Sequence, residues 1–153
     1  MAIATTNPVT GAVIKTFDEL TPEQLDDKLA RAAAAAKSYR LTSVEQRAQW
    51  LNQAADVLEK DADAVSRMTT TEMGKTLQAA REEVAKCVHG LRFYAAHGPA
   101  FLRDLRNDAG NVGAKESFVT YQPIGVVLAV MPWNLPLWQA MKAIENLIIA
   151  RIG

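Results

Sequence analysis

The chain has 153 residues, a mass of 16.7 kDa and 49% hydrophobic residues, which is enough for one ordinary domain with a core. Its 17 basic residues balance 17 acidic ones, so no net positive field exists to hold a nucleic acid. The single cysteine, Cys87, excludes an internal disulfide and a multi-cysteine zinc site. No basic segment followed by an apolar one begins the sequence, so we expect no signal peptide and a cytoplasmic protein.

An extended hairpin is predicted within residues 1–20. Pro8 to Gly11 carries turn residues, because proline presets its φ angle early in a turn and glycine accepts the conformations that the end of a turn requires. Residues Thr5 to Phe17 are therefore expected to form a small extended unit around this turn.

Four amphipathic helices are predicted between residues 21 and 106. Thr21 to Gln24 is a capping box with proline in the first helical position, and it begins a helix that ends near Tyr39. Thr42 to Glu45 is predicted to be a second capping box. The helix that follows it has apolar residues recurring every three or four positions, namely Val44, Ala48, Leu51, Ala55 and Leu58.

The third helix is expected to be capped by Asp61 and to end near Gly74. The fourth begins after Lys75, and we expect it to fray at Gly98 and Pro99. Its apolar stripe consists of Leu77, Ala80, Val84, Cys87 or Val88, Leu91 and Tyr94. Four such helices in sequence suit a bundle.

Two apparent motifs in this region are interpreted as structural. Gly74 to Thr76 resembles the end of a phosphate-binding loop, but the earlier glycine of that motif is replaced by Thr69. Cys87 lies on the apolar stripe, so we expect a buried structural thiol rather than a nucleophile or a metal ligand with His89. His97 has no partner at a metal-binding spacing, and no metal site is predicted.

The last third of the chain changes character. No charged side chain occurs from Ser117 to Met141, about the length of a membrane-spanning helix. Three prolines interrupt that segment, so we exclude a membrane span.

Residues 117–121 favour a strand, and Gly125 to Met131 is a continuous apolar run typical of a strand buried in a parallel sheet. With a helix from about Leu137 to Ile149, this is the start of a βαβ unit with an unfinished sheet, so we expect the isolated chain to aggregate or be partly molten.

The loop Met131 to Pro136 follows the carboxyl end of the predicted strand, where open α/β sheets bind ligands. Two prolines stiffen it, so the amide of Asn134 is held in one orientation, as a donor to a developing oxyanion must be. The structural alternative is a rigid turn with Trp133 packed beneath it. The glycine-rich dinucleotide fingerprint is absent, so a nicotinamide cofactor would bind without that loop.

Residues Tyr121 to Gln139 resemble the first cofactor-domain strand and the asparagine loop of aldehyde dehydrogenases. Resemblance extends over residues 3 to about 142 and is closest to bacterial succinate-semialdehyde dehydrogenases. The other segments that carry it, in the family's order, are Asn7 to Gly11, Arg47 with Ala54 to Leu58, Glu72 to Lys75, and Glu83 to Cys87 with Arg92 to Ala95.

The resemblance implies an α/β fold in which residues 1–153 are part of a cofactor-binding domain: its helices, and then the first strand, loop and helix of the sheet at 125–153. It implies that Asn134 forms half of the oxyanion hole, and that the backbones of Met131, Pro132 and Trp133 line the cleft for NAD or NADP. Residues 116–122 are implied to belong to an arm that pairs with a neighbouring subunit of a homo-oligomer. The implied reaction oxidises a small-molecule aldehyde, succinate semialdehyde by the closest resemblance, to its acid.

Departures from the family pattern limit what the chain is expected to do alone. Leu135 stands where the family commonly has phenylalanine, and the sequence after Lys142 leaves the family pattern. The family's catalytic cysteine and glutamate base have no counterparts in this sequence. Cys87, the single cysteine, does not match the motif of the family's nucleophile. We therefore expect a fragment that is inactive alone. The alternative is a non-catalytic interaction fragment that pairs with a full-length family member through strand 117–122.

Overall fold

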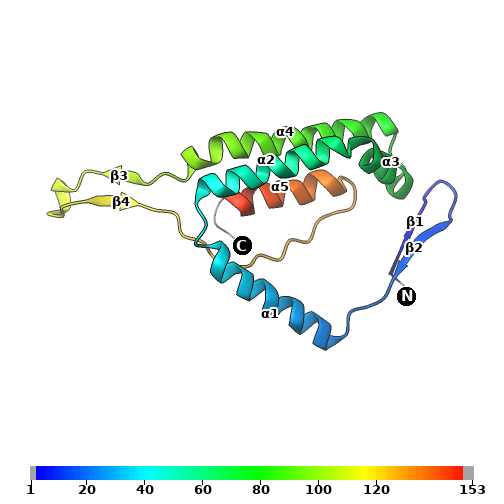
Figure 1. Ribbon diagram of the computed structural model, residues 1–153, viewed down its shortest axis with the longest axis horizontal. Coiled ribbons are helices and arrows are strands. Elements are labelled where there is room, and N and C mark those ends of the chain that lie inside the picture. The colour runs from blue at the N-terminus through cyan, green and yellow to red at the C-terminus, as the bar shows by residue number, and fades with distance from the viewer. Residues whose placement is uncertain (1–2, 150–153) are drawn as a thin grey trace.

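The structure is a computed structural model that describes residues 3–149, with Leu147 described by its backbone only. Figure 1 shows α2, α3, α4 and α5 lying together as one body, with α1 diverging from it and two hairpins projecting at opposite ends. Along the chain the elements are β1 (Ile3–Thr6), β2 (Val13–Phe17), α1 (Pro22–Tyr39), α2 (Val44–Lys60), α3 (Ala62–Met73), α4 (Leu77–Phe101), β3 (Leu105–Asn107), a 3-10 turn (Gly110–Val112), β4 (Ser117–Val119) and α5 (Pro136–Ile149).

The N-terminal hairpin forms as its turn residues predict. Strands β1 and β2 pair antiparallel, with Ile3 opposite Phe17. The side-chain oxygen of Asn7 accepts hydrogen bonds from the backbone N–H groups of Val9 and Thr10 at 2.9 and 3.3 Å. Gly11 follows with a φ of 73°, a left-handed conformation that glycine adopts without steric cost.

Helix α1 begins at the predicted capping box. The hydroxyl of Thr21 accepts a hydrogen bond from the backbone N–H of Gln24 at 3.2 Å, and the Gln24 side chain accepts one from the N–H of Thr21 at 3.0 Å. None of the residues of α1 is buried. Capping therefore defines where this helix starts, while packing contributes little to it.

The second capping box was wrong by one residue. The N-cap of α2 is Ser43, whose hydroxyl accepts a hydrogen bond from the N–H of Gln46 at 3.1 Å. Thr42 instead donates its hydroxyl hydrogen to the carbonyl of Tyr39 at 2.7 Å, closing the turn after α1. Either of these adjacent hydroxyl residues could cap α2. Because the hydroxyl of Thr42 is used in the turn after α1, Ser43 is the N-cap.

Helix α4 is longer than predicted and does not fray at Gly98 and Pro99. It continues to Phe101 with Pro99 inside it. Gly98 is buried, and a Cβ atom built on it would lie 2.7 Å from the Cδ1 of Ile149. The close approach of α5 thus holds the end of α4 helical, which local propensity alone does not predict.

The helical body is built from a different set of helices than predicted. The expected bundle comprised the first four helices, but no residue of α1 is fully buried, and α5 packs against α2 and α4 instead. The core of this body contains Ala48, Leu51, Ala55, Val88, Leu91, Ala95 and Ile149. The last helix is therefore integral to the core.

The second hairpin was only half predicted. Strand β4 lies within the expected segment, and it pairs antiparallel with β3, with Leu105 opposite Val119. Strand β3 was not predicted from the sequence, because three residues carry too little periodicity to distinguish a strand from a loop. All residues of β3 are exposed, and the hairpin projects away from the helical body (Figure 1).

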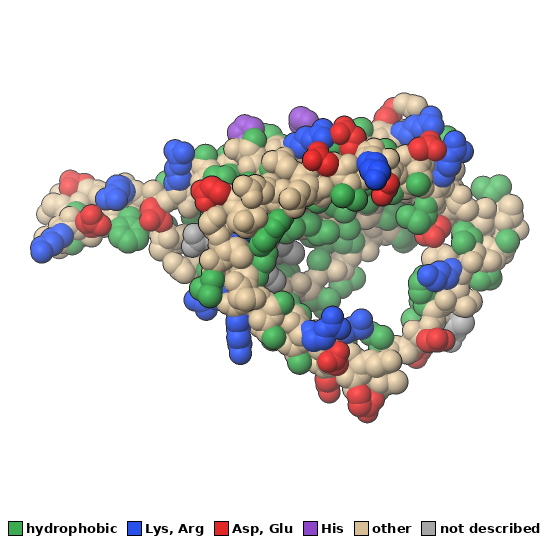
Figure 2. All heavy atoms as spheres, in the orientation of Figure 1, with side chains coloured by type: hydrophobic (Ala, Val, Ile, Leu, Met, Phe, Trp, Pro, Cys, Tyr) green, Lys and Arg blue, Asp and Glu red, His purple; other side chains and the backbone are tan. Residues whose placement is uncertain are grey.

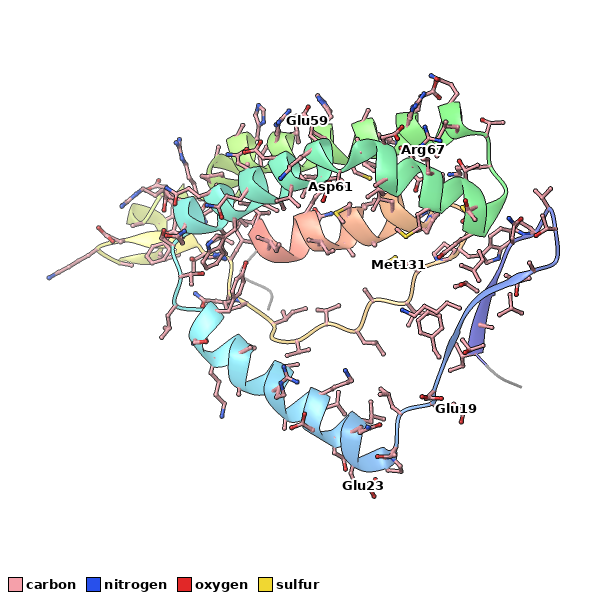
Figure 3. The ribbon with its side chains drawn as sticks, turned by 45° about the vertical axis from the view of Figure 1, so that its right-hand side comes forward. Glu19, Glu23, Glu59, Asp61, Arg67 and Met131 are labelled. Atoms are coloured by element: carbon pink, nitrogen blue, oxygen red, sulfur yellow. The ribbon has the colours of Figure 1, made fainter. Side chains whose placement is uncertain are left out.

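The apolar run Gly125 to Met131 is not a strand, so this prediction is wrong for the described chain. Residues 120–132 form no regular element and pass between α1 and α5, with Met131 near the start of α5 (Figure 3). Leu128 and Val130 are 87% and 82% exposed. A parallel strand needs neighbours for its backbone N–H and C=O groups, and the described residues supply none.

The fold is consequently a mostly helical one with two small antiparallel hairpins, and no parallel sheet is formed among residues 3–149. In that same range, no helix is long and apolar enough to cross a membrane.

Candidate functional site

The loop singled out by the sequence leads directly into α5. Trp133 and Asn134 lie in a turn, and Pro136 is the first residue of the helix. The carbonyl of Leu135 accepts a hydrogen bond from the N–H of Gln139 at 3.0 Å, which closes the first helical turn. Asn134 is exposed and lies two residues before the helix. The position of this asparagine therefore depends on what fixes the start of α5.

Glu83 of α4 fixes that start. Its Oε1 accepts hydrogen bonds from the backbone N–H groups of Leu137 and Trp138 at 3.1 and 2.9 Å. Its other oxygen pairs with the ammonium group of Lys75, and the Glu83 side chain is only 3% exposed. A carboxylate at a helix N-terminus satisfies unpaired N–H groups and interacts favourably with the helix dipole. Lys86 adds a second contact, with its ammonium 4.0 Å from the centre of the Trp138 ring.

The opposite end of α5 is also held by polar groups. Arg47 is fully buried and donates hydrogen bonds to the carbonyls of Thr42 at 2.7 Å and Ile149 at 3.5 Å. The hydroxyl of Tyr39 donates to the carbonyl of Ile148 at 3.1 Å. Burial raises the pKa of Tyr39, although the positive charge of Arg47 opposes that shift. Cations and hydroxyl donors at a helix C-terminus satisfy its unpaired carbonyls.

The roles of Glu83 and Arg47 were not predicted from the sequence, although both residues lie in segments that resemble the family. One signal was available for Glu83. It is a carboxylate that lies one turn before Cys87 on the stripe that the same reasoning took as buried. A charged residue at a buried position requires a partner, and here that partner is the next helix.

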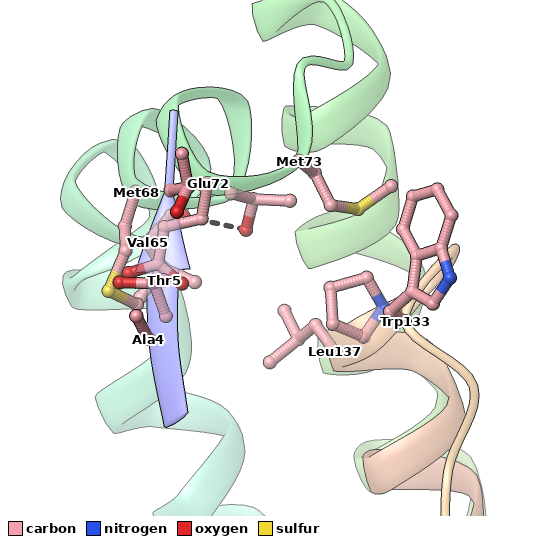
Figure 4. Close-up of a pocket in the computed structure, with 11 residues that line it drawn as sticks. Ala4, Thr5, Val65, Met68, Glu72, Met73, Trp133 and Leu137 are labelled. Atoms are coloured by element: carbon pink, nitrogen blue, oxygen red, sulfur yellow. Dashed lines mark hydrogen bonds between the residues drawn. The ribbon is translucent and has the colours of Figure 1, made fainter. Parts of the chain in front are cut away.

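Two of the predicted cofactor-lining residues line two different depressions of the surface. Trp133 lines a depression of about 480 Å³ together with residues of β1, α3 and the start of α5, as the close-up in Figure 4 shows. Met131 lines a different depression of about 490 Å³ with Lys142 and neighbouring residues. Asn134 and Pro132 line neither of these two depressions. The structural alternative for Trp133, packing beneath a rigid turn, is not what is found, since this side chain is 75% exposed.

The two apparent motifs that were interpreted as structural have structural roles. Gly74 ends α3 with a φ of 76°, and the hydroxyl of Thr76 caps α4 by accepting from the N–H of Ala79 at 3.2 Å. Cys87 is fully buried, and burial together with the nearby carboxyls of Glu83 and Glu145 raises the pKa of its thiol to about 12. No group of three metal-ligating side chains occurs among the described residues.

The loop fits a nicotinamide cofactor in one respect. Within the described chain, no backbone hydrogen bond joins residues 123–134 to other segments, so the N–H groups of Met131 and Trp133 and the C=O groups of Met131, Pro132 and Trp133 remain available to a ligand or a neighbouring strand. These residues are exposed. What the described residues lack is the sheet that would form the floor of a cofactor cleft.

Comparison with known proteins supplies the context for this arrangement. Residues 1–151 match the aldehyde dehydrogenase family. The chain is 49% identical to succinate-semialdehyde dehydrogenase (NADP+) 1 of Mycobacterium bovis and 49% identical to a succinate-semialdehyde dehydrogenase (NADP+) of Mycobacterium avium. Both alignments cover 100% of this chain, and they cover 34% and 33% of the two relatives. The chain therefore spans about a third of the length of these relatives.

Solved structures agree with this assignment. The structure of a succinic semialdehyde dehydrogenase from Streptococcus pyogenes in complex with NADP+ superposes with a TM-score of 0.87 at 33% identity, covering 97% of this chain and 32% of that one. An aldehyde dehydrogenase from Brucella melitensis biovar abortus 2308 superposes with a TM-score of 0.90 at 25% identity, covering 100% and 31% of the two chains. Its sequence and its fold together place the chain in the aldehyde dehydrogenase family, in which it corresponds to the N-terminal third of the known structures.

Proposed function

We propose that this chain supplies the N-terminal part of the cofactor-binding domain of an enzyme that oxidises succinate semialdehyde to its acid with NAD or NADP. The observation that carries the proposal is the pair of hydrogen bonds from the first turn of α5 to Glu83. These bonds fix the start of the helix that follows Asn134. A donor that is fixed before the reaction begins stabilises a developing oxyanion without a cost of reorganisation.

Each residue of the loop has a distinct role in this proposal. The amide of Asn134 donates a hydrogen bond to the aldehyde oxygen as negative charge develops on it. The backbone groups of Met131, Pro132 and Trp133 contact the cofactor. The cofactor, when bound, accepts the hydride. Relatives named for NADP+ favour NADP for this chain, whereas a betaine aldehyde dehydrogenase of similar fold was solved with NAD+.

The projecting β3–β4 hairpin supports a role in assembly. All of its strand residues except Ser117 are exposed, and each strand has only one neighbour among the described residues, so the hairpin presents unpaired backbone groups at its edges. We propose that it is the arm, predicted at residues 116–122, through which the chain pairs with a neighbouring subunit of a homo-oligomer.

A chimeric enzyme tests the proposal. Residues 1–142 of this chain would replace the corresponding residues of the Mycobacterium bovis relative, because the resemblance extends to about Lys142. We expect an oligomer, measured by size-exclusion chromatography, that reduces NADP+ with succinate semialdehyde. The 153-residue chain alone is the control and should give no reduced cofactor, because its single thiol is buried.

A chimera that folds and assembles but has no activity would contradict the proposal. It would then favour the alternative of a non-catalytic fragment, especially if the 153-residue chain co-elutes with the full-length relative.

A further inference from the structure

Glu145 is a buried carboxyl group of α5. It lies on the side of α5 that packs against α4 and is fully buried. Neither of its side-chain oxygens has a hydrogen-bond partner among residues 3–149. On α4 it faces Gly90, where an added Cβ atom would lie 3.0 Å from the Glu145 Cδ. The absence of a side chain at Gly90 therefore leaves the space that the Glu145 carboxyl occupies.

Among residues 3–149, no positively charged side chain forms an ion pair with Glu145. On α4, Cys87 lies close enough to Glu145 for that carboxyl to raise the pKa of its thiol, and Glu83 and Lys86 also act on Cys87. Glu83 binds Lys75 and the start of α5, and the ammonium of Lys86 lies over the Trp138 ring. The α2 group is Arg47, which binds carbonyls including that of Ile149. Tyr39 of α1 donates to the carbonyl of Ile148, and Lys142 of α5 itself is exposed.

Burial raises the pKa of Glu145 from its ordinary value of 4.5 to about 7. Only the protonated, neutral carboxyl is compatible with an apolar contact that provides no partner for a charge. While α5 is packed against α4, Glu145 is therefore protonated between pH 4.5 and about 7, a range in which an exposed carboxyl is ionised.

We propose that protonation of Glu145 controls the docking of α5 on α4, so that the helix is held when this carboxyl is neutral and released when it is ionised. The clamps at the two ends of α5, Glu83 and Arg47, limit the release to the middle of the helix and its contact with Gly90 and Cys87. This inference concerns the chain itself and does not rest on the proposed oxidation of an aldehyde.

The direction of the pH dependence follows from proton linkage. The docked state binds one more proton than the undocked state between pH 4.5 and about 7. Docking should therefore be strongest below this range, weaken by about tenfold per pH unit within it, and stay constant above it.

Cys87 provides a direct readout of undocking. It lies on α4 four residues after Glu83 and three before Gly90, on the side that contacts α5, and it is the only cysteine of the chain. The test measures the rate at which 5,5′-dithiobis(2-nitrobenzoate) modifies Cys87 from pH 5 to 8. Dividing each rate by that of the urea-unfolded chain at the same pH removes the intrinsic reactivity of the thiolate.

We expect the normalised rate of the natural chain to rise by about tenfold per pH unit up to about pH 7 and then to level off. The neutral variant Glu145→Gln should give a normalised rate that does not change with pH, while Glu19→Gln, which alters an exposed carboxyl, should behave like the natural chain. Identical pH profiles for Glu145→Gln and the natural chain would overturn the proposal. If Glu145→Gln does not fold, Glu145→Leu serves the same purpose, because it too has no titratable group.

Discussion

Single residues at helix ends decide where the candidate catalytic loop lies. Glu83 accepts hydrogen bonds from two N–H groups of α5 and pairs with Lys75, so one buried carboxylate on α4 joins the α3–α4 connection to the first turn of α5. Buried ion pairs contribute little net stability when intact, but removing one partner leaves a buried charge without compensation and is costly. This asymmetry makes Glu83 the residue whose change is most informative.

Glu83→Gln should lower the free energy of unfolding by about 2 kcal/mol, since it removes a charge-assisted hydrogen bond and leaves Lys75 unpaired in a partly buried position. The matched control is Glu82→Gln on the same helix, where the carboxyl is exposed and the change should fall within about 0.5 kcal/mol. Urea unfolding followed by circular dichroism measures both. Equal effects of the two substitutions would show that the hydrogen bonds between Glu83 and α5 do not contribute measurably to stability.

At the scale of elements, local signals predicted where most helices begin, and packing decided how they end and associate. The capping box at Thr21 and the αL glycine at Gly74 are encoded within a few residues, so they were predictable. The continuation of α4 past Pro99 depends on α5, which lies some fifty residues further along the chain. The run Gly125 to Met131 has the composition of a buried strand, but a strand requires neighbours that a single segment cannot encode.

Gly98 tests the contact that holds the end of α4. In Gly98→Ala, the gain in helix propensity of about 1 kcal/mol opposes the displacement of Ile149, which costs about 1–3 kcal/mol in a packed core. We expect a net loss of stability, measured by thermal unfolding, and its relief when Ile149 is also changed to alanine. Ala96→Gly, at an exposed position of the same helix, calibrates the propensity alone. A stabilising Gly98→Ala would indicate that α5 does not pack there.

For the whole molecule, the distribution of apolar surface matters more than any one contact. Figure 2 shows hydrophobic side chains gathered around the opening between α1 and the helical body. Helix α1 buries none of its residues, and Leu128, Val130 and Trp133 are at least 75% exposed. Exposed apolar surface on this scale marks a site for a partner, or else a liability to aggregate.

We therefore expect the 153-residue chain to bind 8-anilinonaphthalene-1-sulfonate and to lose the structure of α1 over a broad temperature range before the body of α2 to α5 unfolds. The chimeric enzyme, in which the relative's remaining residues are present, should bind little of the dye and unfold sharply. A soluble monomer of the 153-residue chain with a sharp thermal transition and no dye binding would contradict this expectation.

Those features of the candidate site that lie within a few residues of one another were predictable, and its long-range contacts were not. Asn134 and its loop could be singled out because two prolines and a preceding apolar run are local features. Glu83 could not be connected to that loop from the sequence, because the hydrogen bonds join residues more than fifty positions apart. Glu145 falls in the segment where the sequence leaves the family pattern, so no resemblance indicated its burial.

The measurement that tests the oxyanion role most directly is the turnover rate of the chimeric enzyme after Asn134→Ala. Loss of one oxyanion donor should lower kcat by about 100- to 1,000-fold with little change in KM, because the hydrogen bond strengthens only as charge develops. Asn52→Ala, which removes an exposed amide from α2, should leave kcat unchanged. A kcat for Asn134→Ala within about twofold of the unaltered chimera would show that this asparagine does not stabilise the transition state.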